Sequence, residues 1–191
     1  MTLLRTPQAS PLYEADQRRL GYVANYTRVF ALAPAVQAGW LQLASAVRDG
    51  MDARRYQLVT LAAARRLRSR YCTLAYATAL RAGYFDTATL LAIAADRHRS
   101  GLDEVEVAVM DFAEAIAADP AAATPADVDR LRACGLSDTD IFHVVAAVAA
   151  RRFFTAVLAA TGAVPDDVYD SLDPALRTAL LEPTDGDHRE Q

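Results

Sequence analysis

Residues 54–84 read RRYQLVTLAAARRLRSRYCTLAYATALRAGY, and this stretch decides the fold class. Ala, Leu and Arg, all strong helix formers, dominate it, and apolar residues recur at intervals of three and four rather than two. The spacing predicts two helices, over residues 52–68 and 71–82, joined by a short polar turn. Cys72 then falls in the first turn of the second helix.

The same helical spacing continues on both sides of this stretch. Thr124 and Ser137 are expected to cap helix N-termini, and Gly83, Gly101, Gly135 and Gly162 to end helices in a left-handed conformation. We expect one all-α domain over residues 1–191, with an N-terminal arm at 1–13 and a polar, flexible tail at 182–191. The further helices are expected at 14–32, 34–47, 86–98, 103–118, 125–134 and 138–161, with one or two short ones after them.

Two segments of the chain share an order of features. Residues 52–83 and 137–162 each begin at an acidic or hydroxyl cap and continue through an Ala-rich run, an Arg-Arg pair and an aromatic residue to a glycine. The second segment is shorter and lacks a cysteine. An internal helical repeat and a coincidence of composition both account for the likeness.

Composition limits the classes of protein that the chain can belong to. Its 191 residues include 41 Ala, 20 Arg and no Lys, and the formal net charge is −4, so no basic face is expected for nucleic acid. The longest purely apolar run, residues 144–150, is far shorter than the roughly 20 residues of a bilayer span, so no membrane contact is expected. No secretory signal is evident at the N-terminus, and two cysteines make no disulfide framework, so we expect a cytoplasmic protein.

Residues 54–84 resemble the signature region of the carboxymuconolactone decarboxylase and alkylhydroperoxidase (AhpD-like) superfamily. The resemblance extends to residues 101–142, GLDEVEVAVMDFAEAIAADPAAATPADVDRLRACGLSDTDIF, and to residues 150–163, ARRFFTAVLAATGA. These two stretches are similar to the second half of the peroxidase-related branch of that superfamily. The resemblance implies an AhpD-like helical fold, a homo-oligomer and no cofactor.

Active members of that family carry a Glu and, twelve residues later, Cys-x-x-Cys-x-x-x-His, in which the second cysteine attacks the peroxide. The resemblance places that attacking cysteine at Cys72. It places the resolving cysteine at Ser69, the histidine at Tyr76 and the glutamate at Gln57, so three of the four family residues are replaced. The replacements remove the base and the second thiol of the family's relay.

The residues themselves support a reactive sulfur without a base. Spacings of three and four place Ser69, Cys72 and Tyr76 on one helical face, and the first turn of a helix favours a thiolate. Tyr76 can donate a proton to a leaving alkoxide, whereas Gln57 cannot take up and pass on a proton. The other interpretation of Cys72 is a small buried apolar residue, which is also our expectation for Cys134.

The three histidines, His98, His143 and His188, have no metal-ligand spacing, so no metal site is expected. Arg151 and Arg152 interrupt an Ala-rich apolar helix and need partners if they are buried. Arg151 is expected either to form an ion pair, with Asp111 or Glu114 or at a subunit contact, or to face the Cys72 pocket.

Three functions remain open at this stage. The first is a thiol-dependent, peroxidase-related oxidoreductase with one cysteine, in which Cys72, Tyr76, Ser69 and Gln57 form the site and an external thiol is the reductant. The second is a carboxymuconolactone-decarboxylase-like enzyme that acts on a small organic acid or lactone. The third is a non-catalytic helical oligomer or ligand-binding protein. In the two enzymatic cases the partner is a small molecule, a hydroperoxide or an organic acid.

Overall fold

A computed structural model describes residues 2–182, and every regular element in that range is helical. The all-α prediction is therefore confirmed. Short 3₁₀-helices at Arg97–Arg99, Pro120–Ala122 and Asp167–Ser171 connect the longer helices. The α-helices are α1 (Pro11–Leu20), α2 (Asn25–Phe30), α3 (Pro34–Asp49), α4 (Ala53–Arg66), α5 (Arg70–Gly83), α6 (Thr87–Ala95), α7 (Glu104–Ala118), α8 (Pro125–Ala133), α9 (Asp138–Thr161) and α10 (Pro174–Leu181).

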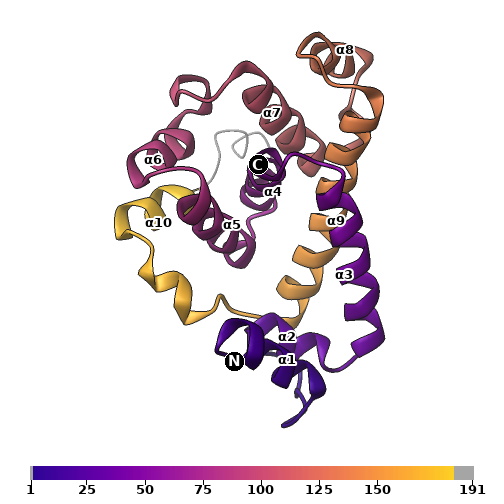
Figure 1. Ribbon diagram of the computed structural model, residues 1–191, viewed down its shortest axis with the longest axis vertical. Coiled ribbons are helices and arrows are strands. Elements are labelled where there is room, and N and C mark those ends of the chain that lie inside the picture. The colour runs from indigo at the N-terminus through magenta and orange to yellow at the C-terminus, as the bar shows by residue number, and fades with distance from the viewer. Residues whose placement is uncertain (1, 183–191) are drawn as a thin grey trace, which may run out of the picture.

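Helix α4 lies at the centre of the molecule, and α5, α7 and α9 pack against it (Figure 1). Its residues from Leu58 to Ala64 are all buried, so these two turns of the helix are enclosed on every side. Leu58 and Leu61 are fully buried, and each contributes about 1.5–3 kcal/mol of hydrophobic stabilisation. Helix α3 runs alongside the long helix α9, and α10 packs against α6 (Figure 1).

Most helix ends follow from local sequence chemistry. Thr124 and Ser137 form capping boxes with acidic residues three positions later, as predicted. Gly101, Gly135 and Gly162 adopt the expected positive φ, but Gly83 does not, because it is the last helical residue of α5 and Tyr84 is the C-cap. Arg68 has φ +53° in the turn between α4 and α5 and so allows α5 to begin at Arg70.

Two of the sequence-based predictions are wrong in detail. The single helix expected at 14–32 is two helices, because Gly21 takes a left-handed conformation and ends α1, which itself begins at Pro11 inside the expected arm. The helix expected at 86–98 ends at Ala95, and a separate 3₁₀-helix covers Arg97–Arg99. The two segments that share an order of sequence features differ in structure, since residues 52–83 form two helices and residues 137–162 form one. Of the tail, only Glu182 lies within the described residues.

Helix α9 has the length and hydropathy of a membrane span, but it serves as a core helix here. Half of its most apolar window is buried inside the protein, against α3, α4 and α7 among others. Its outer face and that of α3 nonetheless leave large apolar side chains exposed, which include Val36, Leu43, Phe142, Val145 and Phe153. We call these residues the α3/α9 apolar face.

Candidate active site

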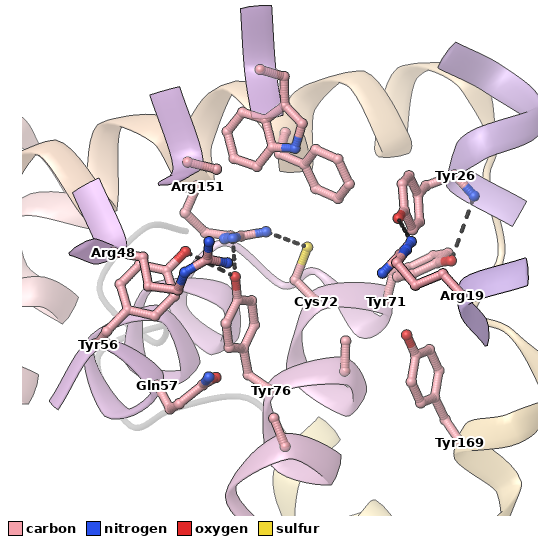
Figure 2. A pocket seen from close by; sticks show the side chains of 15 residues that line it. Arg19, Tyr26, Arg48, Tyr56, Gln57, Tyr71, Cys72, Tyr76, Arg151 and Tyr169 are labelled. Atoms are coloured by element: carbon pink, nitrogen blue, oxygen red, sulfur yellow. Dashed lines mark hydrogen bonds between the residues drawn. The ribbon is translucent and has the colours of Figure 1, made fainter. Parts of the chain in front are cut away.

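A cavity of about 330 Å³ lies between α3, α4, α5 and α9 (Figure 2). Seven of the fifteen residues that line it are aromatic, and Cys72 and Arg151 line it in contact with each other (Figure 2). The inner wall is made of Trp40 from α3, Tyr56 and Gln57 from α4, Cys72 and Tyr76 from α5, and Arg151 and Phe154 from α9. Arg48, also from α3, lies on the side of Tyr56, and the other side is made of Arg19, Tyr26, Tyr71 and Tyr169 (Figure 2).

Cys72 sits in the first turn of α5, as predicted, and is 1% exposed. Its backbone N–H donates to the Oγ of Ser69, the N-cap residue, at 3.4 Å. Its Sγ accepts hydrogen bonds from Arg151 Nη1 at 3.5 Å and from Thr155 Oγ1 at 3.7 Å. Two donors, one of them a cation, are therefore directed at one sulfur.

Arg151 is 4% exposed and has no carboxylate partner among the described residues. Its guanidinium donates to Cys72 and to the Tyr76 hydroxyl and lies 4.6 Å from the centre of the Tyr76 ring. Burial lowers the pKa of a guanidinium, but Tyr76 and Cys72 outweigh burial here, and the pKa of Arg151 is raised. The cation therefore remains in the pocket.

The structure decides between the two interpretations of Arg151. Asp111 and Glu114, its candidate ion-pair partners, are both paired with Arg97 instead. The alternative, a charge that faces the Cys72 pocket, is confirmed. Arg152 points elsewhere and donates to the Ala117 carbonyl at 2.9 Å.

Tyr76 links Arg151 to a second tyrosine. Its hydroxyl accepts from Arg151 Nη2 and shares a hydrogen bond of 3.3 Å with the Tyr56 hydroxyl. Burial raises the pKa of Tyr76, so its hydroxyl stays protonated at neutral pH and can donate a proton into the cavity. The Oε1 of Gln57, which lines the same cavity, is buried without a hydrogen-bond partner.

Hydrogen bonds among Asn25, Tyr71 and Asp166, which we call the Asp166 tie, fix the cavity wall on the other side of Cys72. Tyr71 donates to Oδ2 of Asp166, and the backbone N–H of Asn25 donates to Oδ1 at 2.7 Å. Burial raises the pKa of the Asp166 carboxyl and, together with the bond to Asp166, that of the Tyr71 hydroxyl. Segments near both ends of the chain are thus fixed to the residue that precedes Cys72.

Three of the four predicted site residues, Cys72, Tyr76 and Gln57, line one cavity. Ser69 does not line it; it caps α5 and hydrogen-bonds the Cys72 backbone instead. Sequence reasoning missed Tyr56 and Trp40. The adjacency of Tyr56 to Gln57 was a usable signal for the first, whereas nothing in the local sequence separates Trp40 from an ordinary core residue.

No protein-family model matches the chain, and no curated protein matches it. Solved structures, by contrast, do match the chain. An uncharacterised peroxidase-related protein from Ralstonia eutropha JMP134, described as an alkylhydroperoxidase AhpD core, superposes with a TM-score of 0.78 at 17% identity, over 96% of this chain and 98% of that one. A peroxidase-related protein from Silicibacter sp. TM1040 gives 0.79 at 22% identity, over 89% of this chain and 94% of that one.

A third similar structure is a cysteine-to-alanine variant of the debrominase Bmp8 in complex with 2,3,4-tribromopyrrole. It gives a TM-score of 0.69 at 18% identity and covers 94% of each chain. At such identities the likeness shows the fold. The chain is therefore an all-α protein with a buried, arginine-bound cysteine, and its fold is the AhpD-like fold that its sequence resembles.

Proposed function

We propose that this protein is a thiol-dependent, peroxidase-related oxidoreductase of small organic molecules, with Cys72 as the attacking atom. The observation that carries the proposal is the contact of Cys72 Sγ with the buried guanidinium of Arg151, which has no carboxylate partner in the described part of the chain. A cation in that place stabilises a thiolate, and the thiolate is the nucleophile in cysteine chemistry.

With an organic hydroperoxide the step balances as follows. The Cys72 thiolate attacks the terminal oxygen, an S–O bond forms, and the O–O bond breaks. The leaving alkoxide takes a proton from the Tyr76 hydroxyl, which is regained from water, while Cys72 becomes a sulfenic acid. Arg151 contacts both groups and stabilises the charge as it moves from sulfur to oxygen.

An external thiol completes the cycle, because the position that would hold a resolving cysteine is Ser69. Two thiols reduce the sulfenic acid to the thiol, with one disulfide and one water as products. Cys134, at the end of α8, is a free cysteine packed against a different part of the core. It serves as an internal control for selectivity.

The test is to trap the sulfenic acid. Purified protein is treated with cumene hydroperoxide and a sulfenate-selective dione, and the label is located by peptide mass spectrometry. We expect one label at Cys72, no label in Cys72→Ser, and unchanged labelling in Cys134→Ser. Equal labelling of the intact protein and Cys72→Ser, or a disulfide between the two cysteines, contradicts the proposal.

The aromatic wall supports a second candidate, the reductive dehalogenation of a small aromatic compound. The Bmp8 structure bound to 2,3,4-tribromopyrrole has the same fold. Two external thiols would supply the electrons, so that a bromoarene and two thiols give the arene, a disulfide and hydrogen bromide. Bromide release by wild type, but not by Cys72→Ser, identifies this activity. Turnover of a lactone or organic acid that survives Cys72→Ser favours the decarboxylase-like chemistry instead.

A further inference from the structure

Among residues 2–182, the charged side chains that line the Cys72 cavity are all arginines. Arg19, Arg48 and Arg151 contribute to its wall, and no Asp or Glu in that range does. Arg19 is paired with Asp16 at 2.8 Å, whereas Arg48 makes two solvent-exposed contacts, with Asp49 at 3.7 Å and with the Oγ of Ser45 at 3.3 Å. Figure 2 shows Arg48 and Arg151 directed into the cavity from the side of Tyr56 and Tyr76. Even with Cys72 ionised, the cavity therefore keeps a positive charge.

Arg151 is also incompletely hydrogen-bonded. Its two terminal nitrogens donate to Cys72 and Tyr76, but Nε is buried without a partner. A buried polar group that lacks a partner is costly, and a buried charge more so. An anionic ligand beside this guanidinium compensates its buried charge, and a carboxylate suits the planar fork of a guanidinium.

The rest of the wall is suited to an aromatic ring. Trp40 and Phe154 stack with ring centroids 4.8 Å apart, and Tyr76 and Tyr71 stand on either side of Cys72 (Figure 2). Offset stacking and edge-to-face contacts add favourable energy to the burial of another ring. The volume of about 330 Å³ lies at the lower end of the range for small-molecule sites, which begins at about 300 Å³, so the cavity suits one ring rather than several.

We infer that the Cys72 cavity takes a single-ring aromatic compound that carries one carboxylate group. This inference rests on the proposed function, because it names the substrate class of the same thiol. The carboxylate lies against Arg151 and Arg48, and the ring lies among the aromatic side chains, within reach of Cys72 Sγ.

The experiment measures binding in Cys72→Ala, so that it does not depend on turnover. Isothermal titration calorimetry compares benzoate with benzamide, which is neutral, and with cyclohexanecarboxylate, which is charged but not aromatic. Trp40 is the only tryptophan and lines the cavity, so a change in its fluorescence shows that the ligand is bound there. We expect benzoate to bind at least about tenfold more tightly than benzamide and more tightly than cyclohexanecarboxylate.

Substitutions of the arginines then show which of them binds the carboxylate. Arg151→Met should abolish the preference for benzoate over benzamide, and Arg152→Met, which alters the next residue on the same helix but outside the cavity, should preserve it. If circular dichroism shows that Arg151→Met does not fold, Arg48→Met and Arg151→Lys take its place, and each should reduce the preference. Equal binding of benzoate and benzamide, equal binding of benzoate and cyclohexanecarboxylate, or no binding by any of the three overturns the inference. A sulfenic acid that still forms at Cys72 then leaves the proposed function standing.

Discussion

Replacement of Arg151 by methionine should slow the alkylation of Cys72. The substitution keeps most of the side-chain volume and removes the cation that lies 3.5 Å from the sulfur. At an effective dielectric constant of about 20, two unit charges at that 3.5 Å separation interact by about 5 kcal/mol, which is an upper limit. Hydrogen bonds to charged groups contribute about 1.5–3 kcal/mol, and this range gives the expected loss.

That loss corresponds to a fall of roughly 10- to 100-fold in the rate of reaction of Cys72 with iodoacetamide at pH 7. The second-order rate constant is read by intact-protein mass spectrometry, with the modified cysteine located by digestion. Arg152→Met is the matched control and should react at the wild-type rate, because Arg152 donates to the Ala117 carbonyl and not to the sulfur.

The pH dependence separates a change in ionisation from a change in access. As the pH rises towards 10, the thiolate forms without help from Arg151, and the rates of wild type and Arg151→Met should converge. Equal rates at pH 7 would refute the role given to Arg151. If the ratio of the wild-type rate to the Arg151→Met rate stays constant from pH 7 to pH 10, the substitution alters only the access of iodoacetamide to the sulfur.

Three further predictions concern the site, the tie behind it and the assembly. The triple variant Gln57→Glu, Ser69→Cys, Tyr76→His should raise the rate of dithiol-coupled peroxide reduction by at least about 10²-fold, and each substitution alone should raise it far less. A folded triple variant without this gain in rate would show that the pocket differs from that of the active family at further positions. For Asp166, burial raises the carboxyl pKa above 3.8, so its contribution to stability is present below that value and lost as the pH rises through the folded-state pKa. In urea unfolding, the stability of wild type relative to Asp166→Asn should therefore fall between pH 4 and pH 7, and a rise contradicts the assignment. Sedimentation should give a mass at least twice 20.7 kDa, because the α3/α9 apolar face is exposed, and a monodisperse monomer rules this out.

The boundaries of α9 could be predicted from sequence because local chemistry sets them. Ser137 and Asp140 cap each other at its start, and Gly162 takes a left-handed conformation at its end. Gly21 has the same conformation, but it lies within a stretch whose apolar spacing suggested one continuous helix, so the break between α1 and α2 was missed. Periodicity reports which face of a helix is buried and says little about where a glycine interrupts it.

The position of Cys72 in the first turn of α5 was also predictable, since it depends only on the turn before Arg70. The direction in which the Arg151 side chain points could not be predicted from the sequence. Its sequence allowed an ion pair with Asp111 or Glu114, but in the structure Arg97 pairs with both acids and Arg151 lines the cavity instead. Contacts between residues far apart in the chain are set by packing, and a single sequence carries no local sign of them.

The tie between Asn25, Tyr71 and Asp166 has a consequence for the order in which the protein matures during synthesis. Asn25 and Asp166 are 141 residues apart, and Arg151 follows Cys72 by 79. A ribosome therefore releases the cysteine long before Arg151, which contacts its sulfur, and Asp166, which fixes the neighbouring wall. Until both residues have emerged and packed, the wall around Cys72 is incomplete. The cavity is thus completed late in folding, and fragments released early from the ribosome carry the cysteine without the cavity.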